Sequence, residues 1–190
     1  MNWKSILACF LACVLCFSLW GCGETAEKSA DKNAEPILNV VVYDEKTDTL
    51  SYETISTNGQ RKPTEEFELD AMAVLYADSG CFQQEVQDGK TVNSVVSVDI
   101  FDDEGGQIVP DPIVVEICNQ TAAAHAQPIL ALDILVCGGR YFPVVDLDVD
   151  DQAPVILYYF NTETNTMTAL CRFDSVVIGG LQITNPDNLP

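Results

Sequence analysis

Residues 129–160, ILALDILVCGGRYFPVVDLDVDDQAPVILYYF, decide the fold of this chain. They contain three apolar runs, at residues 129–137, 141–147 and 155–160, which are rich in β-branched and aromatic side chains. Short runs of this composition, bounded by turn formers, predict β-strands. The pair Gly138-Gly139 falls between the first two runs, so a hairpin turn is expected there.

Similar signals extend outward from this stretch. Residues 37–43 and 50–55 flank a group of turn formers and predict a hairpin near the start of the body. Further strands are expected at residues 91–101, 113–118, 168–173 and 175–183, with turns at residues 102–106 and 179–180. This regular spacing of short strands and turns predicts a mainly β fold, a β-sandwich in one domain of residues 36–190.

A single helix is expected at about residues 64–78. Thr64 can cap its N-terminus, and Glu65 and Glu66 suit the first turn. Four apolar residues then share one face at helical spacing: Phe67, Ala71, Val74 and Leu75. Gly80 is a natural end point. The sequence therefore predicts a sandwich with one helix, and an α+β fold is the alternative.

Two stretches of the chain resemble each other. Residues 43–51, YDEKTDTLS, are similar to residues 160–168, FNTETNTMT. The helix expected after the first stretch has no counterpart after the second, which speaks against a duplicated domain. We therefore expect two hairpins that use the same turn chemistry.

The N-terminus carries a basic residue followed by an apolar segment. Lys4 precedes an apolar run at residues 6–20, which is shorter than the roughly 20 residues that a membrane-spanning helix needs. The run closes on Leu19-Trp20-Gly21-Cys22, which resembles the lipobox of bacterial lipoproteins. The resemblance implies that residues 1–21 are a signal peptide and that Cys22 receives a diacylglyceryl group as the first residue of the mature protein.

The residues after Cys22 suit such an anchor. Residues 23–35, GETAEKSADKNAE, hold no large apolar side chain and cannot bury enough surface to offset their ordering entropy. Residues 22–35 are therefore expected to be the lipidated cysteine and a flexible tether. The resemblance implies attachment to the cell membrane or outer membrane through the lipid on Cys22, on the extracytoplasmic face.

Two segments of the body resemble immunoglobulin-like domains of bacterial lipoproteins. They are residues 114–121, VVEICNQT, and residues 138–143, GGRYFP. The likeness consists of a strand that ends in an Asn-x-Thr step and a Gly-Gly turn that leads into an aromatic strand. It implies an immunoglobulin-like sandwich and the binding or assembly role that these domains mainly serve.

Four cysteines lie in the body of the chain: Cys81, Cys118, Cys137 and Cys171. An even number in an extracytoplasmic protein predicts up to two disulfides. Cys118 and Cys137 end two adjacent apolar runs, so we favour that pair together with Cys81–Cys171, and buried free thiols are the alternative. The spacings contain no CxxC and the chain has one histidine, which predicts no Cys/His zinc site.

The charge of the chain is strongly acidic, with 29 Asp and Glu against 9 Lys and Arg and a formal net charge of −20. Nucleic acids and anionic lipid surfaces bind stripes of Lys and Arg, which are absent here, so both are excluded as partners. The acidic surface either keeps the protein hydrated or binds cations or a cationic partner, and the first reading is favoured.

One acidic cluster, residues 146–151 (DLDVDD), begins like a calcium loop. It lacks the glycine at the loop's sixth position, and Leu157 stands where the closing glutamate would be. On a straight strand Asp146 and Asp150 would lie about 13 Å apart, too far to share an ion. We therefore expect alternating acids on the solvent face of a strand. Asp146, Asp148 and Asp150 become metal ligands only if the chain bends.

Catalytic motifs are absent from the sequence. His125 is the sole histidine and lies in an Ala-rich stretch, no Gly-x-Ser-x-Gly elbow occurs, and no phosphate loop or dinucleotide fingerprint predicts a cofactor. We expect a non-catalytic binding or envelope-assembly module with an envelope protein partner. Tyr158 and Tyr159 are candidate anchors for it if their rings are exposed. The alternatives are a cell-wall or glycan-active enzyme and a calcium-dependent adhesion module.

Overall fold

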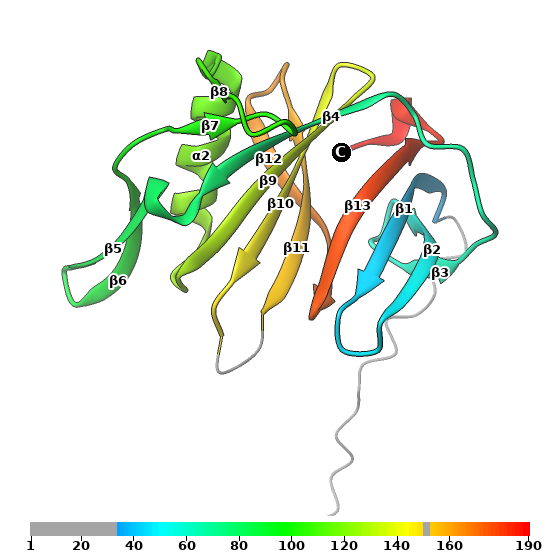
Figure 1. Ribbon diagram of the computed structural model, residues 1–190, viewed down its shortest axis with the longest axis horizontal. Coiled ribbons are helices and arrows are strands. Elements are labelled where there is room, and N and C mark those ends of the chain that lie inside the picture. The colour runs from blue at the N-terminus through cyan, green and yellow to red at the C-terminus, as the bar shows by residue number, and fades with distance from the viewer. Residues whose placement is uncertain (1–33, 150–152) are drawn as a thin grey trace, which may run out of the picture. The chain divides into compact units, whose positions relative to one another are not determined.

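The computed structural model describes residues 34–149 and 153–190 (Figure 1). The predicted signal peptide, Cys22 and all of the tether except its last two residues lie outside this range, as does Asp150. The helices in the described part of the chain are too short or too polar to span a membrane.

The described residues form two large antiparallel sheets, a small third sheet and one α-helix. The seven-stranded sheet has the order β12 (Thr166–Asp174), β11 (Pro154–Asn161), β10 (Arg140–Leu147), β9 (Ile129–Cys137), β4 (Met72–Asp78), β7 (Ile100–Phe101) and β8 (Gln107–Ile108). The four-stranded sheet has the order β13 (Val176–Ile183), β1 (Pro36–Asp44), β2 (Thr49–Ser56) and β3 (Arg61–Pro63). The remaining elements are the pair β5 (Phe82–Gln87) and β6 (Lys90–Val95), the helix α2 (Pro112–Ala124), and the short 3₁₀ turns η1 (Ser79–Cys81) and η2 (Pro186–Asn188).

Two hydrophobic cores lie on opposite faces of the seven-stranded sheet. The first, the sandwich core, joins this sheet to the four-stranded sheet through residues such as Val40, Leu135 and Phe173. The second, the helix core, joins it to α2 through residues such as Ile117 and Ile134. The prediction of a mainly β sandwich with one helix is therefore confirmed for the described part of the chain.

The stretch 129–160 forms the middle of the seven-stranded sheet. It folds into β9, β10 and β11, and Gly138 and Gly139 make the β9–β10 turn with φ of 56° and 73°. Both values lie in the left-handed region, where glycine carries no steric penalty. These strands are covered on both faces, so their sequences read as nearly continuous apolar runs.

The helix is not at residues 64–78, and that prediction is wrong. Residues 64–71 contain no regular element, and 72–78 form strand β4. The Phe67 ring meets Tyr52 edge to face at 5.5 Å, and Leu69 packs on Gly180, where an added Cβ would lie 2.8 Å from Leu69 Cδ2. The backbone N–H of Asp70 donates to Leu181 O, and its carboxylate accepts from the N–H of Ile183 at 2.9 Å. Phe67 and Leu69 therefore contact the four-stranded sheet, whereas Val74 and Leu75 lie in β4 of the seven-stranded sheet, and these tertiary contacts outweigh the helical spacing.

The helix lies instead at Pro112–Ala124, where a strand over residues 113–118 was expected. Asp111 caps it by accepting a hydrogen bond from the backbone N–H of Val114 at 2.9 Å, and Pro112 occupies the first turn. Its buried residues recur at helical spacing: Val114, Ile117, Cys118, Thr121 and Ala122. Three β-branched residues near its start favour a strand by propensity, but the cap and the apolar face decide the outcome.

The two similar stretches form matching hairpin turns, as predicted. Asp44 Oδ1 accepts from the N–H groups of Lys46 and Thr47, and Asn161 Oδ1 accepts in the same way from Glu163 and Thr164. In each turn two threonine hydroxyls lie 2.7 Å apart, and one residue has a left-handed φ, 52° in the first and 55° in the second. The first turn joins β1 to β2 and the second joins β11 to β12.

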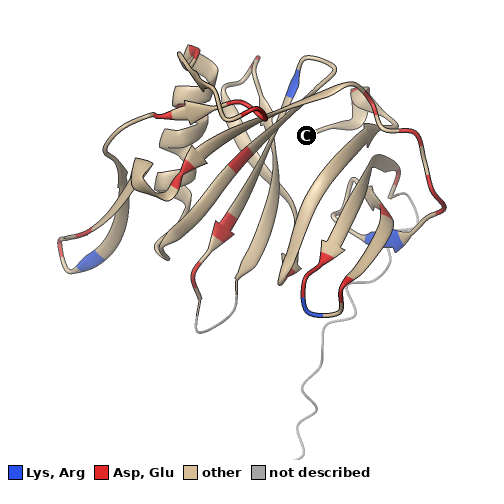
Figure 2. Cartoon of the chain, viewed as in Figure 1, with Lys and Arg blue, Asp and Glu red and all other residues tan. Residues whose placement is uncertain are grey.

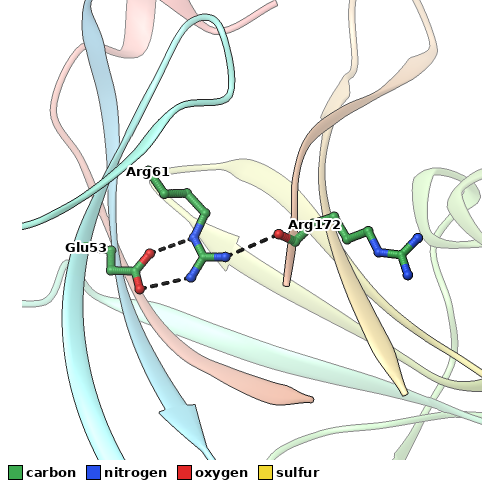
Figure 3. A network of polar contacts seen from close by, with 3 residues as sticks. All are labelled: Glu53, Arg61 and Arg172. Carbon is green, nitrogen blue, oxygen red and sulfur yellow. Dashed lines mark hydrogen bonds and ion pairs between the residues drawn. The ribbon is translucent and has the colours of Figure 1, made fainter. Parts of the chain in front are cut away.

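Arg61 connects the four-stranded sheet to the seven-stranded sheet (Figure 3). Arg61 of β3 makes two hydrogen bonds to the Glu53 carboxylate, at 2.6 and 2.9 Å, and a third from Nη1 to Arg172 O on β12 at 3.2 Å. Its guanidinium also lies 3.8 Å from the centre of the Phe173 ring. Arg61 therefore links the edge strands β3 and β12, which belong to different sheets.

The predicted disulfide pairs are wrong. Cys137 lies in the sandwich core whereas Cys118 lies in the helix core, so the seven-stranded sheet separates them. Cys81 and Cys171 are separated in the same way, and all four residues are free thiols. The expected Cys118–Cys137 pair assumed that residues 113–118 were a strand beside residues 129–137.

We expect the four thiols to resist alkylation in the folded protein. Burial raises the pKa of Cys118 and of Cys171 to about 12, and burial together with Asp70 raises the pKa of Cys137 to about 11. Cys81 is 1% exposed. Since the thiolate is the reactive form, iodoacetamide at pH 8 should label these four cysteines slowly in the native protein and should label each of them after unfolding without reductant. If peptide mapping finds any of these four cysteines unlabelled on the unfolded chain, the free thiols are contradicted.

Candidate functional site

A cavity of about 420 Å³ opens where β4 ends beside the β7–β8 turn and the start of β9. Its walls combine aromatic, acidic and small side chains. The lining residues are Tyr76, Ala77, Asp78, Ser79, Phe101, Asp102, Gly105, Leu130, Ala131 and Asp133. We call this cavity the acidic pocket.

Strand register places the aromatic and acidic residues of the acidic pocket in one row. Tyr76 of β4 pairs with Phe101 of β7 on one side and with Asp133 of β9 on the other. Directly paired residues of neighbouring strands point to the same face of a sheet. Tyr76 and Asp133 therefore share the face that carries Val74 and Leu135, both of which contact the sandwich core.

The rim of the acidic pocket includes a tight acidic turn. Asp102 Oδ1 accepts hydrogen bonds from the N–H of Glu104 at 3.1 Å and of Gly106 at 2.6 Å, and Gly105 has a left-handed φ of 78°. The prediction of a hairpin turn over residues 102–106 is confirmed, since this turn joins the paired strands β7 and β8. Asp78, another lining residue, caps η1 by accepting from the N–H of Gly80 at 2.7 Å.

Asp133 is a partly buried carboxyl of the acidic pocket. Burial raises its pKa to about 6, and within the described chain its carboxyl accepts no hydrogen bond and contacts no cation within salt-bridge distance. Burial raises the pKa of Tyr76 as well, with further contributions from Asp133 and Asp103. A negative charge at Asp133 is therefore poorly compensated by the protein itself.

Asp146 lies near Asp133 on the neighbouring strand β10. Burial raises its pKa to about 6, with additional repulsion from Asp133 and Glu45. It lines a second cavity of about 250 Å³ together with Glu45, Lys46, Val155 and Ser175. Figure 2 shows acidic positions along neighbouring strands of the seven-stranded sheet, with few basic positions close by.

The structure describes two of the three predicted calcium candidates. Asp146 is partly buried instead of lying on a solvent face, Asp148 is exposed, and Asp150 lies outside the described residues. Across residues 34–149 and 153–190, no three His, Cys, Asp or Glu side chains are close enough to hold a metal ion. The described acids therefore form no calcium loop.

The two predicted tyrosine anchors do not meet the condition of exposed rings. Tyr158 is 7% exposed and lies in the helix core, where its hydroxyl is 3.0 Å from His125 Nε2. Tyr159 faces the sandwich core and contacts the Phe142 ring at a centroid distance of 5.6 Å. Both rings serve packing, because β11 is covered on both faces.

Asp133 was not singled out from the sequence. The available signal was one acidic residue inside the otherwise apolar run 129–137. An acid in such a run is partly desolvated when the strand folds, which raises its pKa. Comparison of the chain with protein-family models, curated proteins and solved structures finds no match.

Proposed function

We propose that the protein is a lipid-anchored extracytoplasmic module that binds an envelope protein without catalysis, and that the acidic pocket receives a cationic side chain of this partner. The observation that carries the proposal is Asp133, a partly buried carboxyl with a raised pKa and no compensating cation among the described residues. The anchor part of the proposal rests on the pattern Leu19-Trp20-Gly21-Cys22.

A cationic group suits the chemistry of this pocket. An ammonium or guanidinium placed beside Asp133 would favour the ionised carboxyl and offset its desolvation. The aromatic residues Tyr76 and Phe101 add surfaces on which a cation or its alkyl stem can pack. The net charge of −20 would speed the approach of a basic partner and repel acidic ones.

A glycan-active enzyme is the second candidate, and Asp133 is also the observation that favours it. A carboxyl with a pKa of about 6 is partly protonated near neutral pH, as a general acid must be. Binding is preferred because catalysis by this route needs a second, positioned carboxylate. Asp78 and Asp102 already serve the turn η1 and the β7–β8 turn as hydrogen-bond acceptors.

Carbodiimide cross-linking in cell envelopes tests the binding proposal, because it joins a carboxyl directly to an amine in contact with it. We expect the main intermolecular adduct to link Asp133 to a lysine of another envelope protein. Asp133→Asn should remove most of it, whereas Asp174→Asn, an exposed carboxyl on the far edge strand β12, should not. Adducts spread evenly over the acidic surface would overturn the proposal. Turnover of peptidoglycan that Asp133→Asn abolishes would establish the enzyme instead.

Fractionation tests the anchor separately. We expect the wild-type protein to partition into the detergent phase and Cys22→Ala to remain in the aqueous phase or to stay unprocessed, because the acyl acceptor is lost. Cys171→Ala is a control that removes a cysteine of the body. If Cys22→Ala partitions and migrates as wild type does, the anchor is excluded.

A further inference from the structure

Strands β5 and β6 form an arm that is separate from the large sheets. The arm, Phe82–Val95, is a two-stranded sheet of its own, and β6 is the strand that lies beside α2 (Figure 1). Its outer positions are solvated, and Val86 near the tip is 73% exposed. An isolated two-stranded hairpin is marginally stable in water, so the arm depends on its attachment to the body.

Three side-chain hydrogen bonds attach the arm to one short segment. Asn93 Nδ2 donates to His125 O at 2.7 Å and to Gln127 O at 2.8 Å, and Gln84 Nε2 donates to Ala126 O at 2.8 Å. The acceptors are consecutive backbone carbonyls directly after α2, in residues 125–127. These bonds add to the packing of Phe82 and Val95 against the helix core, so the arm loses part of its attachment when this segment moves.

The ring of His125 holds that segment against the seven-stranded sheet. His125 Nε2 lies 3.0 Å from the hydroxyl of Tyr158 on β11, and the two rings meet edge to face at a centroid distance of 5.9 Å. The residues are 8% and 7% exposed. One residue thus contacts the sheet through its side chain and the arm through its carbonyl.

The surroundings of the ring suit neutral imidazole and oppose imidazolium. Tyr158 faces it from β11 and Asn93 lies against its backbone from β6, while Cys118 of α2 and Cys81 of η1 are thiols in the same helix core. None of these residues is an Asp, Glu, Lys or Arg, and the charged residues of the arm, Glu85, Asp88 and Lys90, are exposed. Burial accordingly lowers the pKa of His125. Asn93 Oδ1 is buried without a hydrogen-bond partner in the described structure, which weakens the attachment further.

We propose that His125 is an acid-sensitive latch whose protonation releases residues 125–127 and the arm while both large sheets stay folded. The released state exposes the ring and takes up a proton with the ordinary histidine pKa of about 6.5. The closed state keeps the ring neutral, so the ratio of released to closed molecules grows as pH falls below that value. Between pH 7.5 and pH 5.5 this ratio should rise about tenfold.

Hydrogen exchange of the full chain at these two pH values tests the latch, after correction for the intrinsic exchange rate. We expect exchange of the arm and of residues 125–127 to accelerate about tenfold at pH 5.5, while the β1–β2 hairpin stays unchanged. His125→Gln should abolish this pH dependence, since glutamine can still contact Tyr158 and does not titrate. Tyr158→Phe should loosen the arm at both pH values and keep the pH dependence.

His125 is the one histidine in the chain, so its imidazole resonance can be followed without ambiguity. A titration midpoint below 6.5 together with faster arm exchange supports the latch. An equal acceleration in His125→Gln would assign the effect to carboxyls such as Asp133 and would overturn the proposal. Acceleration that includes the β1–β2 hairpin, or an imidazole that titrates at or above 6.5, would overturn it as well.

Discussion

Replacement of Arg61 by alanine is expected to lower the free energy of unfolding by about 2 to 4 kcal/mol. The substitution removes two charge-assisted hydrogen bonds to Glu53, one to Arg172 O and the contact with the Phe173 ring. Hydrogen bonds to charged groups contribute roughly 1.5 to 3 kcal/mol, and a partly exposed cation–π contact about 0.5 to 1. The Glu53 side chain is 16% exposed, so its carboxylate would remain partly buried without a partner.

Urea unfolding of Arg61→Ala beside Arg61→Lys measures this effect. Lysine keeps the charge but cannot make the two parallel hydrogen bonds to Glu53, so it should recover only part of the loss. The pair Arg172–Asp174 supplies a control, because these side chains are 54% and 74% exposed and Asp174→Asn should change stability by less than about 1 kcal/mol. A loss for Arg61→Ala no larger than that of the control would show that Arg61 does not link the two sheets energetically.

Asp133→Asn is expected to stabilise the protein by about 1 to 2 kcal/mol at pH 7.5 and to have no effect near pH 4. In the folded protein burial raises the pKa of Asp133 to about 6, against 3.8 for an ordinary aspartate. The folded state therefore binds the proton more tightly than the unfolded state, and the cost of burying the charge disappears as pH falls from about 6 towards 3.8. Each unit of difference between the folded and unfolded pKa corresponds to about 1.4 kcal/mol of unfolding free energy. Partial exposure of Asp133 to solvent reduces this effect.

Thermal unfolding between pH 4 and pH 8 checks the sign of this effect. Asp146→Asn should behave in the same direction, because burial also raises the pKa of Asp146 to about 6. His125 affects the pH dependence of stability in the opposite direction. Burial lowers its pKa in the folded state, so the unfolded state binds the proton more tightly and acidification destabilises the fold. The difference between Asp133→Asn and wild type should therefore shrink with falling pH. If the difference in stability between Asp133→Asn and wild type stays constant from pH 4 to pH 8, the ionised Asp133 carboxylate does not destabilise the folded protein.

Local composition was sufficient to predict most strands but not the position of the helix. The runs in residues 129–160 are continuous because their strands are covered on both faces, and no other local structure suits them as well. Residues 64–71 carry a helix-like pattern, yet they form no helix, and Phe67 and Leu69 instead contact Tyr52 and Gly180 of the four-stranded sheet. The Asp111-Pro112 pair was a usable start signal for the real helix.

The candidate site depended on information that no local pattern contains. Tyr76, Phe101 and Asp133 are far apart in the sequence and meet only through the register of β4 with β7 and β9. The cysteine pairing failed for the same reason, because which face of the seven-stranded sheet each thiol occupies depends on tertiary structure. The turn at residues 102–106 was predictable, since its Asp and Gly residues define it locally.

The seven-stranded sheet gives β9 an unusual sensitivity to changes in length. Ile134 and Leu135 are adjacent in the sequence but belong to different cores. Adding or deleting one residue inside β9 would exchange the faces of every side chain beyond it. A change before Asp133 would turn its side chain towards the helix core. A change after Asp133 would turn Leu135 and Cys137 away from the sandwich core. We therefore expect evolution and protein engineering alike to accept substitutions within β9, and to confine insertions to its ends, such as the Gly138-Gly139 turn.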